Sequence, residues 1–288
     1  MTGLGVLDIG GTHVTAAHID ARTWQLSRAA HRVDLDAHAG ADAILDAIAS
    51  AAAGTQEMAW AVAMPDPFDY ARGIGRFQDV GKFEALDGVD VRAGLARRLG
   101  LTPDRISFCN DADAFTVGEW LVGAGRGATR VVGLTFGTGV GSGWIDAGRV
   151  VDPGVPDGGR AHRLTVDGRP LEDVMSRRAI RRGYAASGGD TAADVREIAG
   201  RARAGEQRAA AVLAHALHSA GRALAGPIAD FGADLIVVGG SMAQSWPLLG
   251  PWFAEGAGAR GLPPVHVAAD SATAPLVGAG YVAVSTSG

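Results

Sequence analysis

The residues best suited to chemistry near the N-terminus are Asp8-Ile9-Gly10-Gly11-Thr12. Glycine turns bring backbone N–H donors close to phosphate oxygens, because no Cβ keeps those oxygens away. Gly10 and Gly11 offer such a turn, and Thr12 adds a hydroxyl. Asp8 places a carboxylate at which Mg²⁺ could bind through water. The stretch therefore predicts a phosphate-binding turn. The alternative is an ordinary hairpin turn, since Asp-x-Gly-Gly is a common sequence.

A second glycine-rich segment, FGTGVGSG, spans residues 136–143 and contains four glycines. A two-residue hairpin turn needs less glycine than this. We therefore predict a second phosphate-binding loop formed by Gly137, Thr138 and Gly139. A glycine-kinked strand is the alternative.

A third glycine segment, Gly239-Gly240-Ser241, follows the apolar run LIVV and precedes an expected helix. In α/β folds, a nucleotide can approach the main chain at such a strand-turn-helix junction. We predict that this turn contributes to nucleotide binding. The alternative is that the glycines serve only close packing of the helix on the strand.

Carboxylates also gather at another expected strand-to-helix junction, where Asn110 is followed by Asp111 and Asp113. Acidic residues at a helix start interact favourably with the helix dipole, which is the interpretation we prefer for Asp113, with Asn110 as N-cap. Phosphoryl transfer to an alcohol also requires a base on the hydroxyl, Mg²⁺ on the phosphates and backbone donors around them. Asp8 and the glycine turns provide the other parts, so Asp111 is predicted to be the general base.

The elements that position these residues follow from the spacing of apolar side chains. Two β-hairpins are predicted, each around a glycine turn, over 5–20 and 131–148. Further strands are expected at 58–64, 105–109 and 234–238. Helices are expected at 39–53, 89–99, 111–123, 171–184, 191–203, 206–231 and in the C-terminal tail at 274–288.

The size and composition of the chain indicate two lobes. At 288 residues the chain is near the length at which a single hydrophobic core stops growing. A hydrophobic share of 47% with 20% charged residues predicts packed cores throughout. We expect a smaller lobe of residues 1–112, joined by the C-terminal helix 274–288, and a larger lobe of residues 113–273, with a cleft between them.

Charge and cysteine content exclude several classes of function. The net charge of −5 gives no basic field for nucleic acid. The single cysteine, Cys109, excludes an internal disulfide and a multi-thiolate zinc site. The N-terminus lacks a basic leader, and no segment approaches about 20 uninterrupted apolar residues, so we expect a cytoplasmic protein without a membrane partner.

The ordered motifs DIGGT, NDADA…GE, FGTGVGSG and VVGGSMA resemble those of the ROK family (repressor, open reading frame, kinase) over nearly the whole chain. Kinase members of that family include bacterial glucokinases and amino-sugar kinases. The resemblance implies an α/β, two-lobed actin-like ATPase fold of the ribonuclease H-like type, in which each lobe has a mixed five-stranded sheet with helices. It also implies a homodimer or higher homo-oligomer.

The resemblance assigns roles to the motif residues. It implies ATP and Mg²⁺ as cofactors, with Asp8 to Thr12 on the phosphates and Mg²⁺. The second phosphate loop would be Gly137 to Gly139, and Gly239, Gly240 and Ser241 would lie by the adenosine. It further implies that Asn110 bonds a sugar hydroxyl and that Asp111 is the base.

The acceptor side of the resemblance is altered. In related kinases a Glu-x-Gly-His segment and a second Glu hold the sugar. Here His162 and Glu172 match, but Gly159 stands where the first Glu is expected and Ala161 replaces the glycine. The Cys-rich zinc loop between these segments is missing, so no zinc is expected. His162 is then either a substrate residue or a core histidine.

Loss of the Glu at position 159 removes an acceptor aimed at one end of a hexose ring. A site built for a hydroxyl discriminates strongly when a partner goes missing. A sugar modified at C1 or C2, or a cyclitol, therefore fits better than glucose. The loop 65–83 is expected to complete the pocket, with Asp66 as its main candidate. Further candidates, which could equally be solvated loop residues, are Gln78, Asp79 and Lys82.

The leading hypothesis is therefore ATP-dependent phosphorylation of a hydroxyl on a sugar, sugar derivative or cyclitol. One alternative is a polyphosphate-dependent kinase. Another is a non-catalytic sugar-binding or regulatory ROK protein. Regulators of the family carry a DNA-binding segment before the kinase-like core, whereas here the first hairpin begins within ten residues of Met1.

Overall fold

The computed structural model describes residues 3–53, 59–154 and 159–286. The chain divides into two compact units, Met1–Val122 with Ala272–Gly288, and Gly123–Ser271. The first unit takes in all of helix α3 (Asp111–Val122), because this helix packs closely along α10 (Ala274–Thr286). A Cβ on Gly278 would collide with the carbonyl oxygen of Ala114. The expected lobe boundary after residue 112, within α3, stays a prediction.

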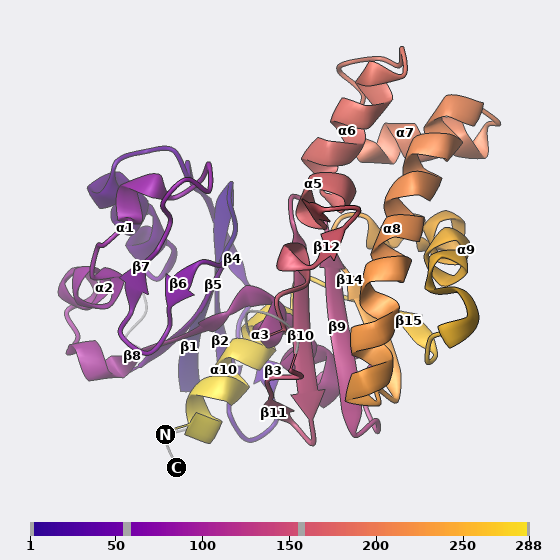
Figure 1. Cartoon of the computed structure of the whole chain (residues 1–288). Helices are drawn as coiled ribbons and strands as arrows, with labels where there is room; N and C mark the ends of the chain where they lie inside the picture. Colours follow the sequence, from indigo (N-terminus) through magenta and orange to yellow (C-terminus); the bar gives the residue numbers. More distant parts are fainter. Residues whose placement is uncertain (1–2, 54–58, 155–158, 287–288) are drawn as a thin grey trace. The chain divides into compact units, whose positions relative to one another are not determined.

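The first unit is built on a mixed sheet in the order β3-β2-β1-β5-β8, with β4 also pairing with β2 (Figure 1). β3 and β4 follow one another along the outer edge of β2, so six described strands occupy five positions. β1 is antiparallel to β2 and parallel to β5, and β5 is parallel to β8. The strands are β1 (Gly3–Ile9), β2 (His13–Asp20), β3 (Gln25–Leu26), β4 (His31–Asp34), β5 (Trp60–Met64) and β8 (Ile106–Asn110).

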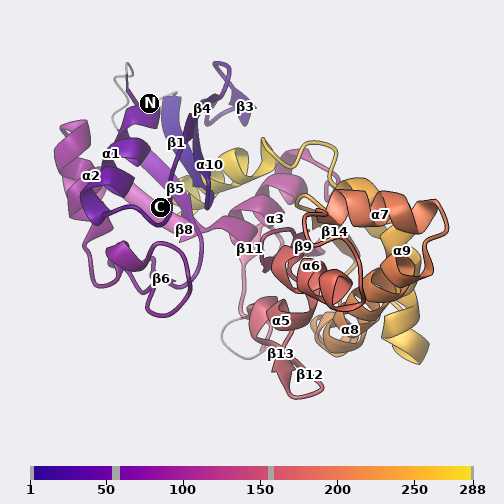
Figure 2. The same cartoon turned by 90° about the horizontal axis from the view of Figure 1, so that it is seen from above.

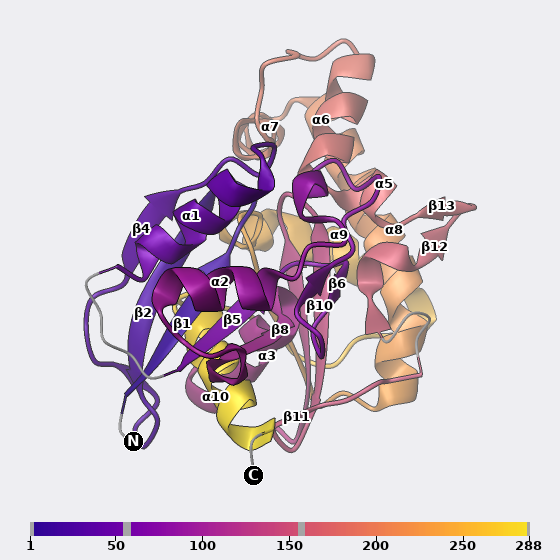
Figure 3. The same ribbon diagram turned by 90° about the vertical axis from the view of Figure 1, so that its left-hand side faces the viewer.

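Helices cover both faces of this sheet. Figure 3 shows α1 (Ala41–Ala51) and α2 (Val91–Leu99) on the near face, with α10 on the far one. The side chains alternate accordingly: Leu7 and Val62 pack with α1 and α2, whereas Val6 and Ala61 pack with α3 and α10. This alternation follows from the two-residue period of a strand. A small hairpin of β6 (Phe68–Asp69) and β7 (Ile74–Gly75) lies in the loop after β5.

The second unit has a five-stranded sheet in the order β11-β10-β9-β14-β15. β9 and β10 form the predicted second hairpin, and β14 is parallel to β9. A large core joins this sheet to helices α5 to α9, and Figure 2 shows α8 beside α9. The strands are β9 (Arg130–Phe136), β10 (Val140–Asp146), β11 (Arg149–Val150), β14 (Leu235–Gly239) and β15 (Val265–Val267), with a separate pair β12 (Thr165–Val166) and β13 (Arg169–Pro170). The helices are α5 (Glu172–Met175), α6 (Arg177–Ala186), α7 (Val195–Arg203), α8 (Gln207–Phe231) and α9 (Trp246–Ala257).

Both predicted hairpins and the predicted mixed α/β class are confirmed, but two helix predictions need correction. The helix expected over 171–184 is divided, because the Ser176 hydroxyl accepts a hydrogen bond from Ala179 N and caps a new helix, α6. The helix expected directly after Gly240 begins later, at Trp246, behind a short 3₁₀ turn. Within the described ranges, no helix is long and apolar enough to cross a membrane.

Candidate functional site

The predicted catalytic residues of the first unit meet at one edge of its sheet. β1, β5 and β8 run parallel, with Asp8 opposite Ala63, and Ala63 in turn opposite Cys109. The carboxyl ends of parallel strands lie at the same edge, which is where α/β folds bind ligands. Asp8 therefore lies in register with Cys109, across β5. Asn110 ends β8, and Asp111 begins α3.

The junction between β8 and α3 is fixed by side-chain hydrogen bonds. Asn110 Oδ1 accepts from Ala112 N at 2.9 Å and from Asp113 N at 3.1 Å, which confirms Asn110 as the N-cap. Asp113 is buried in the first turn of α3. Asp111 is only half-buried, and its Oδ1 accepts from Ala112 N at 2.8 Å. The cap thus leaves the Asp111 carboxylate at the surface of the edge.

Asp8 and Asp111 influence each other electrostatically. Burial, and secondly the negative charge of Asp111, raise the pKa of Asp8 to about 7. The same carboxylates, after burial and Asp113, hold the pKa of the Cys109 thiol far above its usual range. Cys109 is therefore a protonated core residue rather than a nucleophile. The edge is a place where negative charge is crowded and poorly solvated.

A dication would relieve this crowding. Mg²⁺ is commonly held by one or two carboxylates together with substrate phosphates and water, so a half-buried Asp8 with a second carboxylate nearby fits it. Among the residues that the structure describes, no group of three or more His, Cys, Asp or Glu side chains is arranged to hold a metal ion. The Mg²⁺ predicted at Asp8 would thus depend on phosphate oxygens as further ligands.

The loop after β5 adds a tyrosine that sequence reasoning missed. The Tyr70 hydroxyl lies 2.8 Å from Asp66 Oδ1, and Asn110 Nδ2 donates to it at 3.0 Å. Asn110 Nδ2 also donates to Asp66 Oδ2 at 3.0 Å. Asp66 therefore lies beside Asn110, and the acceptor role of both stays a prediction. Nothing in the local pattern around Tyr70 distinguishes it from a solvated loop residue, because its partners come from other segments.

The other candidates in this loop are more exposed to solvent. Gln78 and Asp79 are exposed, and Lys82 is partly exposed. Only Asp79 has an unusual backbone, with a φ of 57°. The substrate role of these three residues stays a prediction.

The first glycine turn differs from the expected one. Neither Gly10 nor Gly11 has a positive φ, so the turn does not use the left-handed conformation that favours glycine. Gly10 N donates to His13 O at 2.9 Å, and the Thr12 hydroxyl lies 3.2 Å from His13 Nδ1. A Cβ placed on Gly11 would have no described atom within 4 Å. The fold itself therefore does not require glycine at position 11.

In the second unit, the two remaining glycine segments lie side by side. β9 and β14 are parallel with Gly239 opposite Thr135, so both strands end at the same edge. A Cβ on Gly137 would lie 3.3 Å from Ser241 Oγ, and one on Gly139 would lie 3.3 Å from the Glu172 carboxylate. The structure therefore brings the 137–139 turn, Ser241 and Glu172 together. Their role toward a nucleotide stays a prediction.

Gly240 and Thr138 are placed by the same packing. Gly240 has a φ of 81°, and a Cβ there would lie 2.5 Å from the Phe136 carbonyl oxygen, so this glycine is required by the fold. Thr138 lies at the tip of the turn, which is closed by a 3.0 Å hydrogen bond from Gly137 N to Gly139 O. Arg177 N donates to Gly137 O at 2.9 Å and ties the turn to the start of α6.

The structure explains why position 159 has no side chain. Gly159 has a φ of 86°, and a Cβ would lie 2.7 Å from the Trp144 ring. Its carbonyl oxygen accepts from Ser142 Oγ at 2.6 Å and from Trp144 Nε1 at 2.7 Å. Glutamate at this position would require both left-handed strain and displacement of a buried tryptophan. The departure from the family pattern is therefore built into the core.

His162 lies in a short 3₁₀ turn (Ala161–Arg163) and is half-buried. Arg163 Nε lies 3.3 Å from His162 Nε2. Ala161, the neighbour that replaces the family glycine, is fully buried, and its N–H donates to Ser142 Oγ at 2.8 Å. His162 is thus partly accessible rather than a core histidine, and its substrate role stays a prediction.

A protein-family model described as the ROK family matches residues 4–156 and 167–261. This chain belongs to the ROK family. The unmatched residues 157–166 include Gly159 and His162, where the Glu-x-Gly-His segment is altered. All three glycine segments, Asp111 and Glu172 lie inside the matched ranges. The internal gap in the match thus coincides with the altered segment.

Known ROK proteins resemble the chain in sequence and fold. It is 28% identical over 211 residues to the glucokinase of Thermotoga maritima, an alignment that covers 65% of each chain. The chain thus spans just under two thirds of that relative's length. The crystal structure of a ROK hexokinase from Thermus thermophilus has a TM-score of 0.80, with 26% identity and 99% of each chain covered.

A ROK glucokinase from Streptomyces griseus, solved with glucose and AMPPNP, has a TM-score of 0.77 at 22% identity and covers 98% of this chain and 99% of its own. At that identity the likeness concerns the fold alone. Together these structures confirm the predicted two-lobed actin-like fold class.

The raised pKa of Asp8 predicts how stability changes with pH. An acid whose pKa is higher in the folded state than its ordinary value of 3.8 binds more protons when folded. The free energy of unfolding therefore falls as pH rises from about 4 to about 7. Asp8→Asn removes this loss, so the variant gains stability relative to wild type across that window and the gain levels off above it.

The measurement is urea unfolding of both proteins in EDTA at several pH values. Asp87→Asn, at an exposed carboxylate, is the matched control for the substitution itself. A difference between Asp8→Asn and wild type that stays constant over this pH range would contradict the raised pKa of Asp8.

Proposed function

We propose that this chain is an ATP-dependent kinase that phosphorylates a hydroxyl of a sugar, sugar derivative or cyclitol. The observation that carries the proposal is the convergence of Asp8, Asp111 and Asn110 at the carboxyl edge of parallel strands, beside a glycine turn that the fold does not need. A metal-phosphate site, a base and an acceptor-binding residue are the parts that phosphoryl transfer requires.

In this proposal Asp111 accepts the proton of the acceptor hydroxyl as the oxygen attacks the γ-phosphate. The N-cap hydrogen bonds of Asn110 fix the first turn of α3, so the Asp111 carboxylate is held in place. Precise placement of the base contributes through proximity as well as proton transfer. The N–H groups of the 10–12 and 137–139 turns would bind the ATP phosphates, with Gly239, Gly240 and Ser241 by the adenosine.

Mg²⁺ would be held at Asp8 through water, where it would neutralise phosphate charge during transfer. Because Mg²⁺ favours the ionised carboxylate, Asp8 must lose its proton for this role, against the burial that raises its pKa. A single half-buried carboxylate with glycine N–H donors nearby suits a metal that arrives with its phosphates.

The acceptor side points away from an unmodified hexose. Gly159 cannot be replaced by the Glu that related kinases use, because its conformation and the Trp144 ring exclude a side chain. Asp66, Asn110, His162 and Glu172 are the proposed acceptor residues. The glucokinase of Thermotoga maritima and the hexokinase of Thermus thermophilus support a carbohydrate-like acceptor. The missing Glu favours a sugar altered at C1 or C2, or a cyclitol.

Asp111→Asn tests the base. The change keeps the size of the side chain but removes its basicity, so we expect kcat to fall by about 10² to 10⁴ with ATP affinity retained. ADP release would be measured with the best acceptor from a panel of hexoses, amino sugars and cyclitols, with ATP or polyphosphate as donor. Asp87→Asn is the exposed-carboxylate control. Wild-type turnover in Asp111→Asn would refute the assignment.

Gly11→Ala tests the glycine turn. Because a Cβ meets no described atom and φ is not positive, the substitution should stabilise the fold by about 0.4–1 kcal/mol. We expect MgATP affinity to fall at least about tenfold, since the methyl group would occupy the space of a phosphate. Calorimetric titration and thermal unfolding measure the two effects.

Gly200→Ala is the matched control, because Gly200 also has no described neighbour within 4 Å but lies in α7. It should gain stability without loss of MgATP affinity. Unchanged MgATP affinity in Gly11→Ala would mean that the turn binds no phosphate.

A further inference from the structure

The amide of Asn110 is fully used by hydrogen bonds within the chain. Its Oδ1 accepts from Ala112 N and Asp113 N at 2.9 and 3.1 Å. Its Nδ2 donates to Asp66 Oδ2 and to the Tyr70 hydroxyl, both at 3.0 Å. A primary amide has two N–H donors and one carbonyl with two lone pairs. These four bonds meet that capacity, so an incoming hydroxyl has to displace one of them.

Tyr70 is held in this network by more than one contact. Its hydroxyl accepts from Asn110 and lies within bonding distance of Asp66 Oδ1 at 2.8 Å and of Met64 O at 3.1 Å. Burial, followed by the charges of Asp66 and Asp111, raises the pKa of Tyr70 well above its usual value. The hydroxyl therefore keeps its proton and continues to bridge Asp66 and Asn110.

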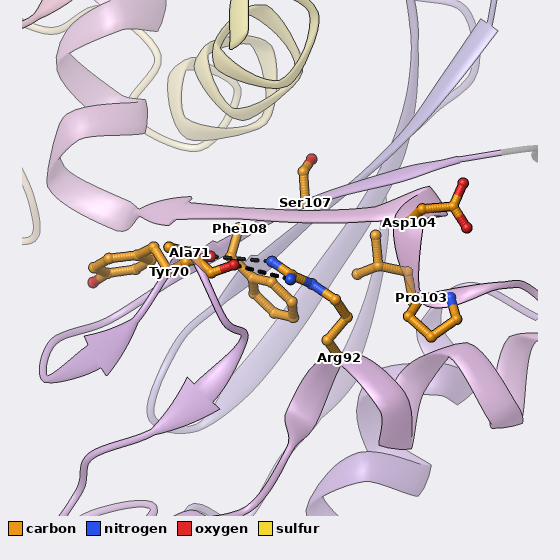
Figure 4. A pocket seen from close by; sticks show the side chains of 8 residues that line it. Tyr70, Ala71, Arg92, Pro103, Asp104, Ser107 and Phe108 are labelled. Carbon is orange, nitrogen blue, oxygen red and sulfur yellow. Dashed lines mark hydrogen bonds between the residues drawn. The ribbon is translucent and has the colours of Figure 1, made fainter. Parts of the chain in front are cut away.

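The main chain of Tyr70 is held from the other side by α2. Arg92 Nη1 donates to Ala71 O at 2.9 Å and Nη2 to Tyr70 O at 3.2 Å (Figure 4). The guanidinium also lies 5.6 Å from the centre of the Phe108 ring. Among the described residues, no carboxylate forms an ion pair with Arg92. Its hydrogen bonds therefore go to the loop that carries Tyr70.

Figure 4 also shows where Arg92 lies relative to the strand. It lines an open pocket of about 590 Å³ together with Tyr70, Ala71 and the residues that begin β8, Ile106 and Ser107. Asn110 ends the same strand. Arg92 thus holds the loop at the start of β8, while the Tyr70 hydroxyl reaches the end of that strand.

We propose that Tyr70 determines acceptor specificity by competing with the acceptor for the Asn110 amide, and that Arg92 is the positioning residue for Tyr70. The inference rests on the proposed function, which defines the acceptor. Sugars whose binding depends on a hydrogen bond to Asn110 are disfavoured, because the amide has to give up Tyr70 or Asp66. Relative to those sugars, polyols whose binding depends less on this hydrogen bond are favoured.

Tyr70→Phe tests this directly. Loss of the phenolic oxygen leaves one Asn110 N–H without its partner and available to an acceptor. We expect kcat/KM for at least one sugar that wild type uses poorly to rise about tenfold relative to the best wild-type acceptor, which is the scale of one hydrogen bond. The KM for ATP should not change. Arg92→Lys should shift the acceptor ranking in the same direction but less.

Asn110→Ser provides the background that isolates the amide. Serine is a good N-cap, so the start of α3 is kept while the amide donors are removed. In this background Tyr70→Phe should no longer change the ranking of acceptors. A ranking shift that persists without the Asn110 amide would overturn the proposal, as would a uniform loss over all acceptors in Tyr70→Phe alone.

Calorimetric titration of the same sugars and cyclitols without nucleotide separates this inference from the proposed function. If no protein transfers phosphate but Tyr70→Phe reorders the dissociation constants, the proposed function fails and the role of Tyr70 stands. If phosphate is transferred but Tyr70→Phe leaves the ranking of acceptors unchanged, the proposed function stands and the role of Tyr70 fails. Absence of binding of every sugar and cyclitol to wild type and variant alike would also overturn the role of Tyr70.

Discussion

The arrangement of the first unit depends on the parallel pairing of β1, β5 and β8. This register places Asp8 and the Asn110-Asp111 junction at one edge, where burial and like charge act together. The raised pKa of Asp8 means that the apoprotein holds a carboxylate in a place where its charge is unfavourable. A protein tolerates such a cost where function requires it, and a bound dication would offset it.

The glycines of the chain separate into those that the fold requires and those that it does not. Gly159 and Gly240 have positive φ values and close neighbours, so their identity follows from packing. Gly11 has neither constraint, and Gly137 and Gly139 have only tight side-chain neighbours. Gly200 lacks both constraints as well, so the case for a ligand at Gly11 rests on the position of this turn directly after Asp8. By the same distinction, the absence of a side chain at 159 follows from packing, whereas packing does not account for Gly11 in the proposed phosphate-binding turn.

Sequence patterns predicted most of the framework because local signals were strong. Alternating apolar residues and glycine turns indicated both hairpins, and Asn110 before two aspartates indicated the start of α3. The division of the 171–184 helix depended on one Ser176 cap, and the short strands β3, β4 and β15 have little apolar pattern of their own. Tyr70 could not be predicted, because its hydrogen bonds join residues 40 and 4 positions away in the chain through the sheet edge. Arg92 was missed for the same reason.

The most direct test of the central claim is phosphorus NMR of the intact protein with MgATP and the acceptor panel. We expect a phosphomonoester signal that grows in step with ADP for at least one modified sugar or cyclitol. ATP converted to ADP and free phosphate without a phosphomonoester, or ATP left unchanged with every acceptor, would contradict the claim that this edge carries out phosphoryl transfer to an alcohol.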